Sequence, residues 1–186
     1  MGLGGCHTGS QVLCPRTTGK EWEIPMKWPS GMEPGNVAVH VRNEMEIGAA
    51  PERVWRWLIA GERWPQWYGN CATFHYLDGL RGPDLAADRS FEWRTFGTRV
   101  RSVVREFEPF HELGWDARST GLYAYHAWML EPAGVGCRVV TEETQRGLVP
   151  MLARWYLRRM LLRGHQGWLE DLRRVAESED PPWAVH

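Results

Sequence analysis

The sequence predicts one α+β domain in which a curved, seven-stranded antiparallel sheet wraps around a long C-terminal helix. Two observations predict this class. Short segments of alternating apolar and polar residues recur about every ten residues, with turn residues between them, as in an antiparallel meander. A long helical period begins only at Val149, so a single long helix is available to cover the sheet. The length of 186 residues is typical of one domain.

The first strand and two short helices precede the meander. From residue 37 to residue 47 apolar residues alternate with polar ones, which predicts a strand. Pro51 suits the first turn of a helix, and residues 64–68 (WPQWY) predict a second short helix. The first of these helices has an apolar face made of Val54, Trp55 and Leu58.

Six further strands make up the meander. Turn signals separate them at Gly97, at Pro109, at residues 119–121 and at residues 132–136. The predicted strands are Cys71–Leu77, Ser90–Thr95, Arg99–Phe107, Glu112–Arg118, Leu122–Glu131 and Cys137–Gln145.

The C-terminal helix is predicted from Val149 to about Ala176. Arginines occupy most of the face opposite its apolar stripe, and we expect that face to be solvated. The stripe repeats at three- and four-residue steps and consists of Ala153, Leu157, Met160, Leu161, Gly164, Trp168, Leu172 and Val175.

The segments flanking the domain lack periodicity. Residues 1–36 are rich in Gly, Pro, Ser and Thr and predict an unstructured arm, although the stretch 20–29 contains two tryptophans and could pack on the domain surface. The domain itself is predicted at residues 37–177, followed by a flexible tail at residues 178–186.

The composition excludes several classes of protein. The net charge of −1 and the pI near 6.7 do not indicate a nucleic-acid partner. No apolar run approaches the roughly 20 residues of a membrane-spanning helix, and residues 1–10 lack the features of a secretory signal. We therefore expect a cytoplasmic protein without an integral membrane segment. The cysteines lack paired metal-binding spacing and predict reduced thiols at Cys6, Cys14, Cys71 and Cys137.

A curved sheet around one helix is expected to leave an elongated apolar cavity between them. Small residues on the helix stripe, Ala153 and Gly164, should leave extra room, and strand alternation predicts which side chains face inward. The predicted ligand-binding residues are Phe91, Trp93, Ser102, Val104, Trp115, Trp128 and Thr141 on strands, with Ala153, Leu157, Met160 and Gly164 on the helix.

His126 and Glu143 are the candidate catalytic pair inside this cavity. The predicted hairpin places His126 opposite Thr141 and diagonal to Glu143. A carboxylate beside an imidazole favours the imidazolium, and such a pair could act as a general base. The alternative is a hydrogen-bonded polar network without catalysis, and the lone histidines His75 and His165 are expected to be structural.

Four sequence segments resemble the SRPBCC superfamily. They are IGAAPERVW (47–55), WPQWY (64–68), EFEP (106–109) before a strand ending in LGW (113–115), and GCRVVTEE (136–143). This helix-grip group includes START lipid-transfer domains, birch-pollen-allergen proteins and polyketide cyclase/dehydrase proteins, and the resemblance covers about residues 37–176. It implies an apolar ligand inside the fold. The superfamily has no shared catalytic signature.

The resemblance leaves three hypotheses for function open. The first is a carrier or binding protein for an apolar small molecule such as a lipid, polyketide or aromatic metabolite. The second is a cofactor-independent polyketide cyclase/dehydrase-type enzyme using His126 and Glu143. The third is an interaction module acting through the outer sheet or the arginine-rich helix face. No cofactor or metal is expected, because the chain shows neither the cluster motif nor the iron triad of the superfamily's oxygenases.

Overall fold

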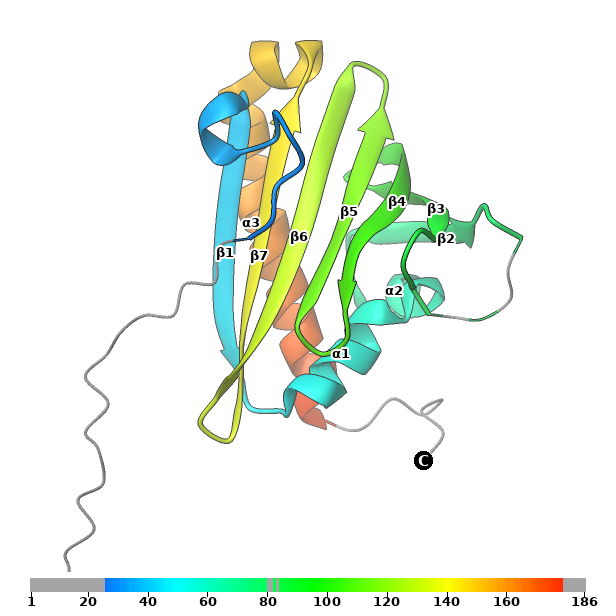
Figure 1. Cartoon of the computed structure of the whole chain (residues 1–186), viewed down its shortest axis with the longest axis vertical. Helices are drawn as coiled ribbons and strands as arrows, with labels where there is room; N and C mark the ends of the chain where they lie inside the picture. Colours follow the sequence, from blue (N-terminus) through cyan, green and yellow to red (C-terminus); the bar gives the residue numbers. More distant parts are fainter. Residues whose placement is uncertain (1–25, 80–81, 83, 179–186) are drawn as a thin grey trace, which may run out of the picture.

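The computed structural model describes residues 26–79, 82 and 84–178. Its seven strands form one antiparallel sheet in the order β1-β7-β6-β5-β4-β3-β2, which curves around α3 (Figure 1). The predicted fold class is therefore confirmed. The elements are β1 (Val39–Ile47), α1 (Pro51–Ile59), α2 (Trp64–Trp67), β2 (Cys71–Tyr76), β3 (Ser90–Thr95), β4 (Thr98–Glu108), β5 (Glu112–Ser119), β6 (Leu122–Ala133), β7 (Gly136–Arg146) and α3 (Leu148–Ser178), with 3-10 turns at Pro34–Asn36 and Gly61–Arg63.

Trp64, the first residue of α2, lies at the centre of the main core. Its ring centroid is 5.1 to 5.7 Å from those of Trp93, Trp115 and Trp168. Its indole N–H donates a hydrogen bond of 2.9 Å to the carbonyl of Leu58, so the buried polar atom is satisfied. These contacts join α1, α2, the middle of the sheet and α3 into one cluster of buried aromatic side chains.

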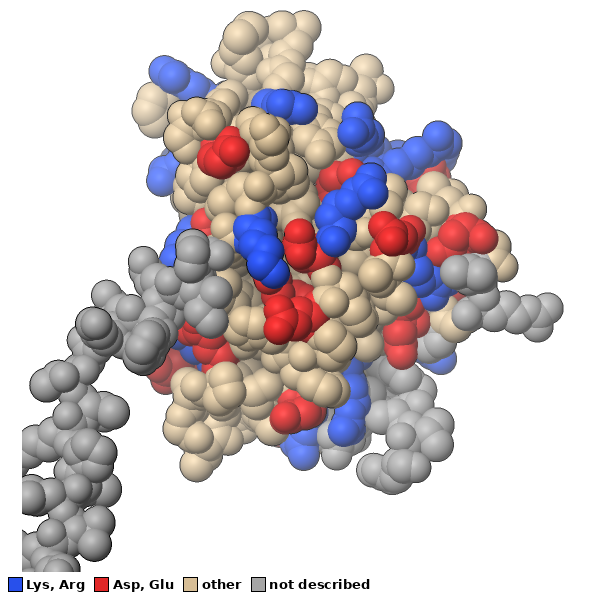
Figure 2. All heavy atoms as spheres, in the orientation of Figure 1, with Lys and Arg blue, Asp and Glu red and all other residues tan. Residues whose placement is uncertain are grey.

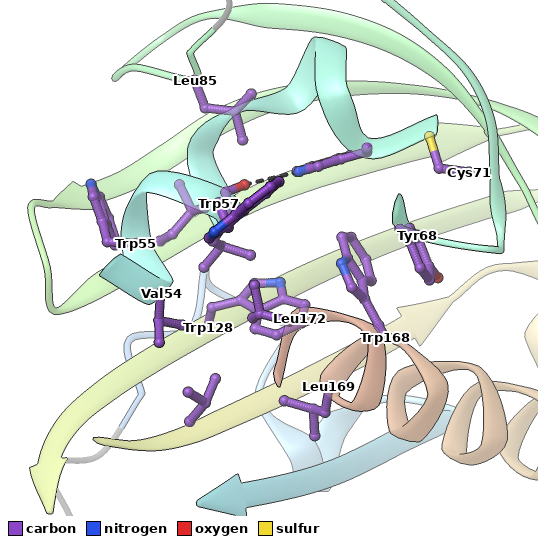
Figure 3. Packing of buried hydrophobic residues seen from close by; sticks show 14 of the residues in the cluster. Val54, Trp55, Trp57, Tyr68, Cys71, Leu85, Trp128, Trp168, Leu169 and Leu172 are labelled. Atoms are coloured by element: carbon purple, nitrogen blue, oxygen red, sulfur yellow. Dashed lines mark hydrogen bonds between the residues drawn. The ribbon is translucent and has the colours of Figure 1, made fainter. Parts of the chain in front are cut away.

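The second half of α3 packs tightly into this core. Trp168 stacks on Tyr68 with ring centroids 4.0 Å apart and planes 9° apart, and it meets Trp128 edge-on at 4.9 Å. Leu169 and Leu172 are fully buried beside it (Figure 3). Side chains at these helical spacings share one face, so the stripe predicted from the sequence is the buried face of this half.

The first turn of α3 differs from the rest of the helix. Ala153 has non-helical backbone angles (φ −113°, ψ 22°), so the predicted continuous helix is interrupted there. The backbone N–H of Val149 bonds the carbonyl of Gly121 at 3.1 Å, which holds the first turn against the β5–β6 turn. Residues 148–152 therefore sit at the end of the sheet, outside the main core (Figure 1).

Part of the predicted unstructured arm packs on the outer face of the sheet. Met26 and Met32 are buried in a second cluster with residues of β6 and β7, and Trp28 meets the ring of Tyr125 at 5.9 Å. Lys27 adds an ion pair of 3.1 Å with Glu112. The outer faces of these strands are apolar. Residues 26–36 therefore cover a surface that faces solvent in an antiparallel sheet with only one buried face. Residues 1–25 and 179–186 lie outside the described residues.

Within the described residues, no helix combines the length and the apolar character needed to cross a bilayer.

Candidate functional site

A cavity of about 640 Å³ lies between the inner face of the sheet and α3. Its inner end is formed by the buried side chains of Trp93, Trp115 and Trp168. Its outer end is formed by the turns β3–β4 and β5–β6 and by Val149 and Tyr156 of α3, which are exposed. The cavity therefore runs from the aromatic core to the surface beside the first turns of α3.

Buried indole groups supply hydrogen-bond donors at the inner end. The N–H of Trp93 donates to the hydroxyl of Ser102 at 3.2 Å. Those of Trp115, Trp128 and Trp168 have no partner among the described residues. A buried donor without a partner is destabilising, and two of these three tryptophans, Trp115 and Trp168, line the cavity.

Three polar side chains converge in the cavity: His126 from β6, Glu143 from β7 and His165 from α3. Nδ1 of His126 lies 3.4 Å from Oε2 of Glu143, and Nε2 of His165 lies 3.1 Å from the same oxygen. The two imidazole rings stack with centroids 4.6 Å apart and planes 19° apart. We call these residues the His–Glu–His cluster.

Neighbouring side chains hold the cluster in place. Nε2 of His126 is hydrogen-bonded to the Thr141 hydroxyl at 2.7 Å. The side-chain amide of Gln145 donates to the other carboxylate oxygen of Glu143. Each contact uses the atom of His126 or Glu143 that does not face the other members of the cluster. Because Thr141 and Gln145 both belong to β7, this strand sets the orientation of the two side chains.

The pKa of His126 lies well below its ordinary value, because burial disfavours the charged ring and His165 adds a smaller effect in the same direction. The sequence prediction was the reverse, that the carboxylate would favour the imidazolium. That prediction is wrong because the side chain of His126 is almost wholly buried, and burial disfavours the charged ring. The ring is neutral at pH 7.

The predicted register of the β6–β7 hairpin was also wrong by two residues. His126 pairs with Glu143 directly, and Trp128 pairs with Thr141. Pairing continues to Ala133 and Gly136, which leaves only Gly134 and Val135 in the turn, and Gly134 has a positive φ of 59°. The tight turn brings Glu143 closer to His126 than the longer predicted loop would.

The predicted site residues fall into two groups. Those that line the cavity are His126, Glu143, Trp93, Trp115, Leu157 and Met160. The others do not line it. Ser102 and Thr141 form hydrogen bonds with lining residues, and Trp128 stacks on His126. Phe91 and Val104 are buried in the core, and Ala153 lies at the helix kink.

The prediction that Gly164 leaves room for a ligand is wrong. A Cβ atom there would overlap the ring of Phe96, which sits on the helix at this point. Phe96 belongs to the β3–β4 turn and has a positive φ of 49°. Gly164 instead allows the β3–β4 turn to pack closely on α3. A smaller hollow of about 400 Å³ lies beside this contact, and Arg159 and Arg163 help to line it.

Sequence reasoning missed several polar residues of the cavity, among them Gln145 and His165. A signal existed for each. Gln145 continues the inward alternation of Thr141 and Glu143 along β7. His165 lies four residues after Leu161 and three before Trp168, so it occupies a position of the apolar stripe and points inward with them.

These features define a helix-grip protein with an internal cavity. Among solved structures, the hypothetical protein jhp0584 from Helicobacter pylori is similar, with 28% sequence identity and a TM-score of 0.76 over 82% of this chain and 96% of that chain. The di-domain ARO/CYC StfQ from the steffimycin biosynthetic pathway shares 19% identity (TM-score 0.63; 75% of this chain, 50% of that chain). A START superfamily protein from Mycobacterium smegmatis shares 11% identity (TM-score 0.62; 74% of this chain, 97% of that chain).

The chain belongs to the family described as polyketide cyclase / dehydrase and lipid transport, whose model matches residues 38–177. The predicted membership of the SRPBCC superfamily is thereby confirmed. No curated protein sequence matches the chain.

Proposed function

We propose that this protein binds an apolar small molecule that carries one or a few polar groups. The observation that carries the proposal is the cavity of about 640 Å³, with aromatic side chains and the His–Glu–His cluster in its wall. Its size lies within the range of about 300–1,000 Å³ found for small-molecule sites, which are also mostly apolar with a few placed polar groups.

The distribution of polar atoms suggests how such a ligand would lie. Its polar group would face the His–Glu–His cluster. Its apolar part would run along Leu157 and Met160 toward the outer end. A lipid, a polyketide or an aromatic metabolite has this division of polarity, so we propose a carrier or binding protein for a ligand of one of these kinds.

Native mass spectrometry of the gently purified protein tests this proposal. We expect an additional mass that disappears on denaturation. In parallel, titration with the apolar fluorescent probe anilinonaphthalene sulfonate should give saturable binding. Ala117 lines the cavity, so the variant Ala117→Phe should weaken this binding at least about 10-fold, because the added ring fills the cavity. Val135→Phe is the matched control, since Val135 is fully exposed in the β6–β7 turn. Equal probe binding by both variants, with Ala117→Phe folded by circular dichroism, would contradict the proposal.

A second candidate is an acid–base enzyme of the cyclase/dehydrase kind. It is favoured by one observation, a neutral His126 held by Thr141 and Glu143 at the buried end of the cavity. A neutral imidazole can accept a proton from a carbon next to a carbonyl group. His126→Ala separates the two functions: a binding protein keeps most of its ligand affinity, whereas an enzyme loses about 10²-fold or more in rate.

A further inference from the structure

The three ligand-type atoms of the His–Glu–His cluster have the spacing of a metal site. Oε2 of Glu143 lies 3.1 and 3.4 Å from the nearest ring nitrogens of His165 and His126, and all three atoms lie within 4.8 Å of one another. Donor atoms bound at about 2.0–2.2 Å to a tetrahedral zinc ion are about 3.3 Å apart. Two of the three separations therefore match a coordinated ion already, and the third, between the two ring nitrogens, is at most 4.8 Å.

The outer contacts also match those of a metal site. Metal-binding histidines and carboxylates are usually held through the atom that does not bind the ion. Here the Thr141 hydroxyl contacts the far nitrogen of His126, and the Gln145 amide contacts the far oxygen of Glu143. Nδ1 of His165 is buried and has no hydrogen-bond partner among the described residues. His165 therefore lacks the outer contact that His126 and Glu143 have.

The charge of the cluster favours a cation. Glu143 is buried, and within the described part of the chain no lysine or arginine forms an ion pair with it. An uncompensated buried carboxylate is costly, and histidine binds metal through its neutral form.

We propose that His126, Glu143 and His165 bind one divalent transition-metal ion, with Zn²⁺ or Fe²⁺ as the chemical class. Two histidines and one carboxylate are a known ligand set for both ions, and they leave coordination positions open. Those positions would face the cavity, where a ligand's carbonyl or hydroxyl oxygen could reach the ion. The sequence did not suggest this site, because its ligands are separated along the chain and share no motif. The proposal does not rest on the proposed function.

The test uses the full-length untagged chain, stripped with a chelator and titrated with Co²⁺. We expect binding of one ion per chain with a Kd at or below the micromolar range, visible in the absorption of the bound cobalt, and a rise in Tm with added metal. His165→Phe and Glu143→Gln should each weaken binding by at least about 100-fold, and Thr141→Val, which removes only the outer contact, by about 10-fold.

Two controls keep the result interpretable. His75→Ala alters a strand histidine outside the cluster, and replacement of Cys6 and Cys14 by Ser removes thiols that could bind cobalt. Both should leave the affinity unchanged. The proposal is overturned if the wild-type chain binds no stoichiometric metal, or if folded His165→Phe and Glu143→Gln bind it as tightly. Either result leaves the ligand-binding proposal standing, because probe binding is measured separately.

A second inference starts from the exposed apolar side chains at the beginning of α3, which we call the α3 tip. The α3 tip lies at the top of Figure 2, where few residues are charged. Single exposed apolar residues are normal, but a contiguous set of large ones marks an interaction site. The set, with exposures from 40% to 75%, is Leu148, Val149, Met151, Leu152, Trp155 and Tyr156.

The charge and position of the α3 tip indicate its partner. The sequence from Arg146 to Leu169 contains five arginines and no acidic residue, and Arg154, Arg158 and Arg159 are exposed beside the tip. Val149 and Tyr156 also line the outer end of the cavity. Cationic helices with Trp, Tyr and Leu on their apolar side bind the interface of anionic bilayers.

We infer that the α3 tip docks on the surface of an anionic lipid bilayer. The apolar side chains would enter the interface, the arginines would contact lipid phosphates, and the opening of the cavity would face the lipid. An apolar ligand could then pass between bilayer and cavity without crossing water. This last point rests on the proposed function, whereas docking itself does not.

Vesicle flotation of the full-length chain tests the inference. We expect binding to vesicles that contain phosphatidylglycerol, at least about 10-fold weaker binding to pure phosphatidylcholine, and weakening by salt. The double variant Leu152→Glu/Trp155→Glu should lose binding to both, while Val135→Glu, which changes an exposed valine in the β6–β7 turn, should not. The inference is overturned if the wild-type chain ignores both vesicles, or if sedimentation equilibrium without lipid shows a dimer that the double variant dissociates, which would make a second copy of the chain the partner.

Discussion

The two halves of α3 have similar sequence periodicity but opposite surroundings. In the second half Trp168, Leu169 and Leu172 are buried against the sheet, α1 and α2. In the first half Leu152, Trp155 and Tyr156 are largely exposed. The difference arises because the kink at Ala153 and the end of the sheet leave the first turns without a partner layer. The exposed residues lie outside the predicted stripe, whose members Leu157 and Leu161 are buried in a cluster with Val39 and Val41 of β1. The first half of α3 therefore carries a second apolar face that nothing among the described residues covers.

The largest expected effect is at the buried half. Trp168→Ala should destabilise the protein by about 3–5 kcal/mol, because it removes a fully buried ring that stacks on Tyr68 and contacts Trp64. Chemical denaturation followed by circular dichroism measures the free energy of unfolding. A loss below about 1 kcal/mol would mean that the aromatic core is not the main stabilising unit.

Gly164→Ala tests the point where α3 meets the β3–β4 turn. Alanine is favoured over glycine in a helix by up to about 1 kcal/mol, but here its methyl group would overlap the Phe96 ring. We expect a net loss of about 1–3 kcal/mol in the free energy of unfolding. In the background Phe96→Ala the same substitution should become neutral or stabilising. Equal effects in both backgrounds would show that Phe96 does not occupy this position.

Thr141→Val tests the polar part of the cavity wall. The change keeps the side-chain shape but removes the hydroxyl that contacts His126, so we expect a loss of about 1–3 kcal/mol in stability. The comparison Thr144→Val is the control, because the Thr144 hydroxyl is buried without a hydrogen-bond partner among the described residues. If both variants lose the same stability, the contact with His126 does not contribute.

The smallest expected effect is at the exposed half. Trp155→Ala should change the free energy of unfolding by no more than about 0.5 kcal/mol, although it removes the same kind of side chain as Trp168→Ala. The ratio of the two effects measures directly how differently the two halves are packed. A loss above about 2 kcal/mol would indicate that the α3 tip is covered in solution, and sedimentation would then show whether a second chain covers it.

Much of the candidate site could be predicted from the sequence. Alternation along each strand correctly turned His126, Glu143, Trp93 and Trp115 inward, and all four line the cavity. It could not separate them from Phe91 and Val104, which also face inward but are covered by other core side chains. Inward direction is a property of one strand, whereas a place on the cavity wall depends on what other elements leave uncovered.

The sequence by itself determined the order of the elements, the antiparallel meander and the inward faces of strands and helix, because backbone geometry imposes periods that short stretches of residues reveal. Only the tertiary structure decided the two-residue difference in the β6–β7 register, the covering of the outer sheet by residues 26–36, the kink at Ala153 and the meeting of His165 with His126 and Glu143. These features join residues that are distant in the chain, and their energies depend on packing and desolvation in the assembled fold, which no local pattern encodes.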